Sequence, residues 1–366
     1  SKLQKMSIAD LNEMAKEMGI ENFGTMKKHE VIFQLLQKNA ESKGIYYYDF
    51  NIETGKLSNK KLAAEIEIPS FLAFSTNKKL LYAVGEVNNF DSNSSGTVNA
   101  YAVTENGTLQ FINKVSSNGA HPCHISLNNK NKTAAVSNYT GGSISIHKVD
   151  KNGNLNEAFQ VINHNLDSVK SHAHSAKFLN NNLFVADLGR DILAQYVENN
   201  NQQYVLEENY TMKSGTGPRH FEITKDGAFI YVINELNSTV SVLKNDGRSY
   251  SKIQNISTLS DGYEGENSCA DIHLSKNQTF LYGSNRGENT IVVYKRNIEN
   301  GTLEKIQSVS VEGNWPRNFA IVPNGKFLLV ANQRSNNISV FKIDQKLGKL
   351  SFLYNEAFDS PVCLLF

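Results

Sequence analysis

Short apolar runs separated by polar turns fill most of the chain, and residues 217–243 show this layout most clearly. The stretch opens with a small polar cluster, continues through an apolar segment, turns at 225–227 (Lys-Asp-Gly) and returns as a second apolar segment that ends at Asn234 and Glu235. A third apolar segment, 239–243, follows. Two β-rich segments joined by an Asp-Gly turn predict an antiparallel hairpin, and the third segment extends it into a meander.

The polar opening of this stretch recurs every 45 to 51 residues along the chain. Its copies begin at Ser70, His121, Ser171, Gly217, Ser268, Trp315 and Ser360. A repeat of about 40–50 residues that carries four short strands is typical of β-propeller blades, each of which is too small to bury its own apolar face. The sequence therefore predicts an all-β fold, a seven-bladed β-propeller.

Six of the predicted blades are complete, and the seventh is divided between the two ends of the chain. Its innermost strand is expected at 360–366 (SPVCLLF), and its outer strands are expected at 44–50 and 62–68, joined by a turn at 53–57. Sharing one blade between the chain ends closes the ring and removes exposed strand edges.

The seventh blade also needs a second strand, and the run that precedes residue 44 is VIFQLLQ at 31–37. Val, Ile and Phe tolerate a strand, whereas the Leu-Leu-Gln ending favours a helix. We expect a helix here and a three-stranded seventh blade. Inclusion of this run in the sheet is the alternative.

Residues 1–43 do not share the strand pattern, and they predict a small N-terminal helix-loop-helix as a separate segment before the propeller at 44–366. Ser7 with Asp10 can begin a helix in the manner of a capping box, and 27–38 predicts a second helix. The segment resembles the N-terminal helical domain of the transcription terminator Rho, through SIADLNEMAKEMGI and KKHEVIFQLL. The resemblance implies nucleic-acid binding, which a gel shift with RNA at varied salt would detect. Seven Lys against six acidic residues supply little phosphate neutralisation, so a structural appendage is the favoured interpretation.

Composition narrows the class of protein and its surroundings. A hydrophobic content of 40% with a formal net charge of +1 predicts a globular protein with an ample core and no nucleic-acid groove. Three cysteines are an odd number, which favours reduced thiols over a disulfide framework. No apolar run approaches the roughly 20 residues that cross a bilayer. We expect a cytoplasmic protein with no membrane partner.

Polar residues gather at two places in the repeat, namely the start of the first strand and the end of the second. In an antiparallel hairpin these two places lie side by side, so all of them should share one mouth near the axis of the ring. Six of the nine histidines lie in the opening clusters. The first place contributes His121, His124, His172, His174, Arg219, His220, Asp271, His273, Arg317 and Asn318, and the second contributes Asn138, Tyr139, Asp187, Asn234, Glu235, Asn285, Arg286, Asn332 and Gln333.

Such a concentration of titratable groups around one opening predicts a binding or catalytic site. Some of these residues have a structural interpretation as well. Inner-strand histidines can bond the backbone of a neighbouring blade, and the asparagine that recurs in four blades can cap the strand-end turn. Glu235 and Arg286 occupy equivalent positions in adjacent blades but differ, so they are the strongest functional candidates.

We expect no metal and no cofactor. The pairs His172/His174 and His121/His124 could supply imidazoles to zinc, but residues i and i+3 of a strand do not share a face, and the nearby arginines would repel a dication. The mouth has no nucleophile elbow, no phosphate loop and no carboxylate pair at glycosidase spacing.

The repeated motifs resemble the lactonase family of seven-bladed propellers, which includes the propeller-type 6-phosphogluconolactonase and the carboxymuconate lactonising enzymes. The resemblance covers residues from about 41 to 366 and rests on five blade motifs in order: HPCHISL; SHAHSAKF with FVADLGRDIL; GPRHFEI with YVINELNSTVSV; CADIHLS with LYGSNRGENTIVVY; and PRNFAI with LLVANQRSNNISVF. It implies hydrolysis of an anionic sugar-acid lactone without a metal.

The family's catalytic residues correspond to His174, Glu235, Arg219 and Arg286. Either His174 or Glu235 would activate water, and the two arginines would bind the anionic group and the developing oxyanion. Further residues of the mouth are expected to bind substrate: His121, His124, His172, His220, Asp271, His273, Arg317 and Asn332. The alternative function is a non-catalytic propeller that binds a small anion or a protein partner.

Overall fold

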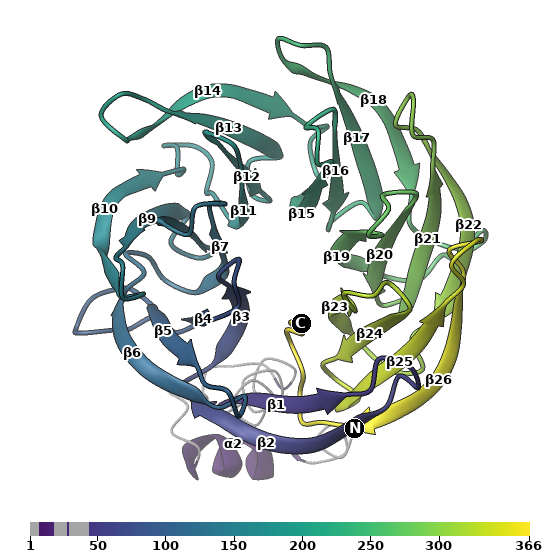
Figure 1. Cartoon of the computed structure of the whole chain (residues 1–366), viewed down its shortest axis with the longest axis horizontal. Helices are drawn as coiled ribbons and strands as arrows, with labels where there is room; N and C mark the ends of the chain where they lie inside the picture. The colour runs from purple at the N-terminus through teal and green to yellow at the C-terminus, as the bar shows by residue number, and fades with distance from the viewer. Residues whose placement is uncertain (1–6, 18–27, 29–43) are drawn as a thin grey trace.

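The computed structural model describes residues 7–17, 28 and 44–366, and it is an all-β propeller (Figure 1). Six four-stranded antiparallel sheets surround a central axis, with the first strand of each innermost. The first three blades are β3 (Pro69–Phe74), β4 (Leu80–Gly85), β5 (Thr97–Val103) and β6 (Leu109–Ser116); β7 (Pro122–Leu127), β8 (Thr133–Asn138), β9 (Ser143–Val149) and β10 (Leu155–Asn163); and β11 (Ala173–Leu179), β12 (Asn182–Asp187), β13 (Ile192–Glu198) and β14 (Tyr204–Thr211).

The next three blades continue the ring in the same order. They are β15 (Pro218–Ile223), β16 (Phe229–Asn234), β17 (Thr239–Asn245) and β18 (Tyr250–Ser257); β19 (Ser268–Leu274), β20 (Phe280–Arg286), β21 (Thr290–Arg296) and β22 (Leu303–Ser310); and β23 (Pro316–Ile321), β24 (Phe327–Asn332), β25 (Asn337–Ile343) and β26 (Leu350–Ala357). The predicted meander of 217–243 is therefore β15, β16 and β17.

Apolar side chains between neighbouring blades form the core. The cluster between the fourth and fifth blades includes Tyr231, Ile233, Ile272 and Leu281, all with at most 1% of their surface exposed. The Tyr231 hydroxyl donates a 2.8 Å hydrogen bond to the carbonyl of Gly301, in the turn of the next blade. Tyr82 and Tyr282 make the equivalent contact in other blades, so this repeated bond ties consecutive blades together.

The strand register confirms that the two polar places of the repeat lie side by side. Pro218 at the start of β15 pairs with Asn234 at the end of β16, and Ser268 at the start of β19 pairs with Arg286 at the end of β20. The same pairing recurs in the other four blades.

Each inner strand also carries a β-bulge near its start, which the sequence did not predict. Pro218 and His220 of β15 pair with two consecutive residues of the partner strand, so Arg219, which lies between them, is the extra residue. The extra residues of β3, β7, β11 and β23 are Ser70, Cys123, His174 and Arg317, and in β19 the shift lies between Cys269 and Ile272. A bulge changes the direction of a side chain, and here it occurs at the same layer of every blade.

The seventh sector differs from the prediction. β1 (Gly44–Phe50) pairs with β2 (Leu57–Glu65), so the outer strand begins at residue 57 rather than 62 and the predicted turn is shorter. The Tyr354 hydroxyl on β26 contacts the amide of Leu57 and the carbonyl of Gly55 at 2.7 and 3.0 Å. This link repeats the one between Gln307 and Leu350 in the preceding pair of blades, so β2 occupies the place of an outermost strand.

The C-terminal run 360–366 was predicted to be the innermost strand of this sector, and this prediction was wrong. The run has no strand assignment in the structure, and in Figure 1 it passes from β26 towards the inside of the ring. A strand requires a neighbouring strand for its ladder, and among the described residues none pairs with this run. Its backbone bonds a side chain instead: the amide of Leu364 donates to Oδ1 of Asn318 at 2.7 Å. The sector therefore has two strands in the described part of the chain, not three.

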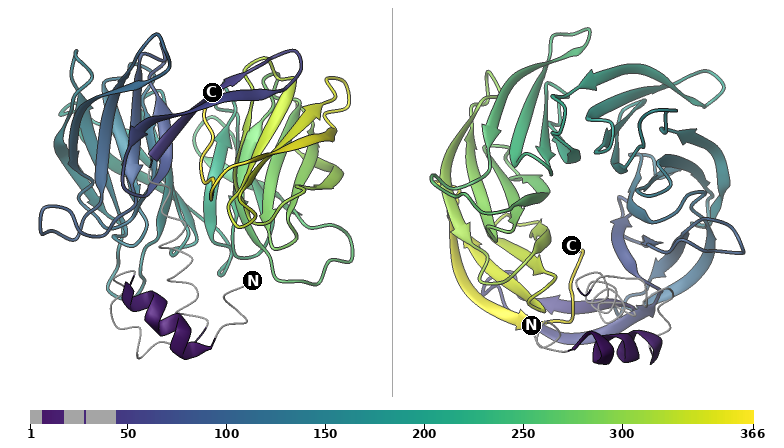
Figure 2. Two further views of the ribbon diagram at one scale, coloured as in Figure 1. Left: turned by 90° about the horizontal axis from the view of Figure 1, so that it is seen from below. Right: turned by 180° about the vertical axis from the view of Figure 1, so that it is seen from behind.

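The first predicted helix is present as α2 (Ile8–Glu17), outside the ring (Figure 2). The amide of Asp10 donates to the Ser7 hydroxyl at 3.1 Å, and the amide and hydroxyl of Ser7 donate to the Asp10 carboxylate at 3.3 and 2.7 Å, which confirms the capping box. The second predicted helix, 27–38, and the run 31–37 lie outside the described residues except for Lys28. Within the described part, no helix is long and apolar enough to cross a membrane.

Candidate active site in the central channel

The bulges place consecutive residues of the inner strands on the wall of one cavity. A regular strand would turn two consecutive side chains to opposite faces. Here Arg219 and His220 both line a narrow space near the axis. The full lining is Ser70, Phe71, Cys123, His174, Arg219, His220, Arg317, Asn318 and Val362.

Glu235 forms the centre of a cluster with two arginines, of which Arg219 lines this cavity. Its Oε2 lies 2.9 Å from Nε of Arg219 and 2.9 Å from a terminal guanidinium nitrogen of Arg286. Its Oε1 accepts a 3.1 Å bond from the Ser268 hydroxyl, and Arg286 also donates to the carbonyls of Ser268 and Cys269 at 3.1 and 2.9 Å. We call Arg219, Glu235 and Arg286 the arginine–glutamate cluster.

Electrostatics keep this cluster charged. Burial raises the pKa of the Glu235 carboxyl, but the charges of Arg286 and Arg219 outweigh burial and hold that pKa below its usual value. Burial lowers the pKa of Arg286 to about 10 and lowers the pKa of Arg219 as well. All three groups are therefore ionised near pH 7, and the cluster carries one net positive charge.

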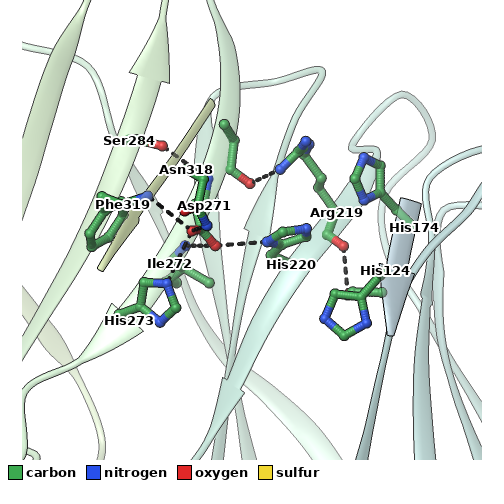
Figure 3. A network of polar contacts seen from close by, with 12 residues as sticks. His124, His174, Arg219, His220, Asp271, Ile272, His273, Ser284, Asn318 and Phe319 are labelled. Carbon is green, nitrogen blue, oxygen red and sulfur yellow. Dashed lines mark hydrogen bonds and ion pairs between the residues drawn. The ribbon is translucent and has the colours of Figure 1, made fainter. Parts of the chain in front are cut away.

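Asp271 forms a second cluster deeper in the channel (Figure 3). Its Oδ1 accepts a 2.7 Å bond from Nδ1 of His220, and its Oδ2 accepts bonds from Nε2 of His273 at 3.0 Å and from the Asn318 amide at 2.6 Å. The backbone amides of Ile272 and Phe319 also donate to this carboxylate, at 3.0 and 3.3 Å. We call Asp271, His220, His273 and Asn318 the aspartate–histidine cluster.

The two histidines of this cluster differ in charge. His273 has a carboxylate at each ring nitrogen, Asp271 on one side and Glu222 at 3.3 Å on the other, so both nitrogens donate only if the ring is protonated. Burial lowers the pKa of His273, but Asp271 outweighs it and raises that pKa to about 10. Burial, and to a smaller extent the charge of Arg219, lowers the pKa of His220 to about 4. Burial raises the pKa of Asp271, and the charge of His273 with the hydrogen bonds from His220 and His273 brings it well below its usual range.

His174 lies on the wall of the same cavity without a carboxylate partner. Its ring is 5.1 Å from that of His220 and 5.6 Å from that of Tyr139, and its Nδ1 is 3.9 Å from Sγ of Cys123. Burial, then the charge of Arg219, lowers the pKa of His174 well below its usual value. The imidazole is therefore neutral near pH 7.

The remaining predicted substrate-binding residues are spread over several levels of the channel. Arg317 lines the cavity and faces Glu86 at 3.6 Å. His121 bonds Thr140 at 2.8 Å in an exposed position, whereas His172 stacks on Tyr139 with ring centroids 4.5 Å apart.

Of the twelve predicted site residues, His174, Arg219, His220 and Arg317 line the cavity, and the others, including His124 and Asn332, do not. His124 packs on Phe71 below it, with centroids 4.3 Å apart. Asn332 is fully buried, and its amide donates to the carbonyl of Val311 and the hydroxyl of Ser339 at 3.3 and 2.7 Å. The structure does not bring Asn332 to the site, because its amide is used to bond a neighbouring loop and strand, as are the amides of Asn138 and Asn285.

Sequence reasoning missed three charged residues of the channel. Lys177 and Glu222 form a 2.8 Å ion pair that continues to His273. Lys177 lies two positions after Ser175, and Glu222 lies two positions after His220. Alternate residues of a strand share a face, so this spacing could have identified both residues. Glu86 directly follows the last residue of β4, as Glu235 directly follows the last residue of β16. The repeat could therefore have revealed Glu86.

Among the residues that the structure describes, no group of three or more His, Cys, Asp or Glu side chains is arranged to hold a metal ion. The site brings together guanidinium groups, ionised carboxylates and neutral imidazoles around a small cavity.

Comparison with known families decides the classification. Residues 23–366 match the sequence model of the family described as "Lactonase, 7-bladed beta-propeller". The chain belongs to this lactonase family. A 6-phosphogluconolactonase of Formosa agariphila is 37% identical over 86% of this chain and 92% of its own length, and one of Bacillus subtilis is 30% identical over 89% and 95%.

Solved structures of lactonase-family proteins agree with this assignment. The periplasmic gluconolactonase of Pseudomonas aeruginosa has a TM-score of 0.81 at 29% identity, covering 87% of this chain and 94% of its own. A putative 6-phosphogluconolactonase of Bacteroides fragilis has a TM-score of 0.78 at 33% identity, covering 88% and 93%. The likeness thus extends over the whole ring.

Proposed function

We propose that this lactonase-family protein hydrolyses a sugar-acid lactone of the 6-phosphogluconolactone type at the central cavity. The observation that carries the proposal is the arginine–glutamate cluster, which holds two guanidinium groups in fixed positions beside neutral imidazoles. The names of the relatives from Formosa agariphila and Bacillus subtilis support the same reaction.

Lactone hydrolysis needs a group that stabilises negative charge on the carbonyl oxygen when water adds. Arg219 and Arg286 supply such charge in a buried setting, where it acts more strongly than in water. A guanidinium group can also bind a phosphate or carboxylate through paired hydrogen bonds. With Arg317, three guanidinium groups meet the two carboxyl groups of Glu235 and Glu86, an excess of basic side chains that favours an anionic lactone.

Glu235 serves to position the arginines. Its carboxylate is engaged by both guanidinium groups and by the Ser268 hydroxyl. Its two 2.9 Å ion pairs fix the guanidinium groups before the substrate arrives, which is the preorganisation that electrostatic catalysis requires. The proton of the attacking water then passes to an imidazole of the cavity wall.

The direct test compares the decay of 6-phosphogluconolactone with and without the protein, because such lactones also hydrolyse spontaneously. Proton release at constant pH measures the rate. We expect a saturable acceleration that is lost when Arg219 and Arg286 are both changed to Met. A wild-type rate equal to the spontaneous rate would remove the proposal, and an unchanged rate in the double variant would point to a contaminating enzyme.

We also propose that the ring has seven blades, with β1 and β2 as the outer strands of the seventh. The contact of Tyr354 with Leu57 and the family's description support this count. The division at residue 43, a nucleic-acid role for residues 1–43 and a cytoplasmic location stay predictions. The family match begins at residue 23, so the propeller domain can include part of that segment.

A further inference from the structure

His220 combines two features that no other histidine of the cavity wall shares. Its Nδ1 lies 2.7 Å from a carboxylate oxygen of Asp271. Its Nε2 is buried and has no hydrogen-bond partner among the described residues. Figure 3 shows the ring between Asp271 on one side and Arg219 and His174 on the other. A buried nitrogen without a partner, on a ring that lines a cavity, is a place where a ligand or water can bind.

The contact with Asp271 decides which nitrogen of His220 carries the proton. An ionised carboxylate only accepts hydrogen bonds, so Nδ1 must donate. In a neutral imidazole the other nitrogen, Nε2, then has a free lone pair. Asp271 is itself held by His273, Asn318 and two backbone amides, so it cannot turn away. The arrangement matches the carboxylate-oriented imidazole that acts as a base in hydrolytic triads.

The other two candidate bases lack this arrangement. Glu235 is committed to two arginines and a serine hydroxyl. Among the described residues no carboxylate contacts the ring of His174, and its Nδ1 faces the thiol of Cys123 at 3.9 Å. Neither is oriented by an acid.

We propose that His220, oriented by Asp271, is the general base that activates water for lactone hydrolysis. This inference rests on the proposed function. Nε2 takes a proton from water while the water oxygen bonds to the lactone carbonyl carbon and the carbonyl π electrons move to the carbonyl oxygen. When the carbonyl re-forms, the bond from carbon to the ring oxygen breaks, and that oxygen takes the proton from Nε2. The product is the open hydroxy acid, and His220 returns to its neutral state.

Charged and titratable groups face His220 from each strand packed against it. They are Arg219 beside it on β15, His174 and Lys177 on β11, His124 on β7 and Asp271 on β19. Burial and the cations lower the pKa of His220 to about 4, whereas Asp271 opposes them. His220 is therefore neutral, and able to accept a proton, throughout the range from about pH 5 to pH 8.

The experiment compares His220→Gln with the matched variant His174→Gln. Both are assayed with glucono-δ-lactone, which has no phosphate that titrates, and with 6-phosphogluconolactone. Loss of a general base lowers kcat by about 10²–10⁴-fold. We expect such a loss in His220→Gln with KM nearly unchanged, together with loss of the decline in kcat/KM at acidic pH. We expect His174→Gln to keep that decline.

A rescue measurement separates a base from a structural residue. His220→Ala leaves a space beside the cavity, and we expect added imidazole to restore part of its rate in proportion to concentration. Thermal unfolding verifies that each variant is folded. An active wild type with His220→Gln within tenfold of it, or a loss that imidazole does not rescue, overturns the assignment of His220 alone. A wild type without lactonase activity overturns the proposed function itself.

Discussion

The arginine–glutamate cluster and the aspartate–histidine cluster are built on neighbouring blades around one carboxylate each. Glu235 is paired with two guanidinium groups, which are protonated near pH 7. Asp271 is surrounded by two imidazoles and an amide. The first cluster can therefore hold a fixed charge, whereas the second contains a ring that can gain or lose a proton.

Because of this difference, the two clusters contribute to different steps of the proposed reaction. Stabilising an oxyanion requires charge that does not move, and accepting a proton requires a neutral group with a lone pair. The two clusters meet at adjacent residues of β15, because Arg219 belongs to one and His220 to the other. The bulge in β15 is what lets both side chains face the cavity.

The largest effect is expected from Asp271→Ala, which removes the centre of the aspartate–histidine cluster. The change leaves the protonated His273 and the buried Asn318 amide without their carboxylate, and breaking a buried ion pair in this way costs about 3–5 kcal/mol. The free energy of unfolding in urea, followed by the fluorescence of Trp315, measures it. Asp246→Ala, at an exposed turn, is the control and should change it far less. Equal losses in the two variants would contradict the assignment of Asp271 as the centre of this cluster.

Arg286→Met tests the fixed charge of the other cluster. Removing one donor that stabilises an oxyanion typically lowers kcat by about 10²–10³-fold. We expect a loss of that size in lactone hydrolysis at saturating substrate, and no loss in Arg248→Met, which removes an exposed arginine of the loop between β17 and β18. Unchanged kcat and KM in Arg286→Met would exclude its proposed role.

Glu235→Gln should have a smaller effect, because the amide keeps the shape of the side chain and can still accept hydrogen bonds. Weakening one charge-assisted bond corresponds to about a tenfold change in rate. We expect the pH profile of kcat/KM to keep its shape, since in this scheme Glu235 positions the arginines. A loss of several thousandfold with disappearance of the acidic decline would identify Glu235 as the base instead.

The pH dependence of stability gives a further test of the aspartate–histidine cluster. The pKa of His273 is raised in the folded protein to about 10, above the unfolded value of about 6.5, so its stabilisation is complete below about pH 6.5 and lost as pH rises towards 10. The difference in Tm between wild type and His273→Gln should therefore shrink over this range. His220, with a folded pKa of about 4, contributes the opposite trend: stability falls as pH drops from about 6.5 to about 4. A His273 imidazole that NMR finds neutral at pH 8 would contradict the first trend.

Much of this arrangement could be predicted from the repeat. The spacing of the polar openings located the inner strands, and hairpin geometry brought His174, Arg219, Glu235 and Arg286 to the same end of their blades. The bulge could not be predicted, because it depends on how each inner strand packs against its neighbours. Without it, Arg219 and His220 would point to opposite faces.

The ends of the chain also show where local pattern is insufficient. SPVCLLF has the composition of a strand, but it is not one in the structure, and among the described residues no strand pairs with it. Asn332 is a polar residue at a repeat position that was predicted to face the mouth. Its amide instead bonds Val311 and Ser339 inside the blade.

The sequence by itself determined the number and order of the strands in six blades, since apolar alternation and turn residues act within a few positions. Only the tertiary structure decided the partners of the charged groups. His220 and Asp271 are 51 residues apart and meet because two blades pack side by side at the axis. Which imidazole receives a carboxylate, and which carboxylate receives two arginines, depends on that packing, and the proposed division between fixed charge and proton transfer follows from it.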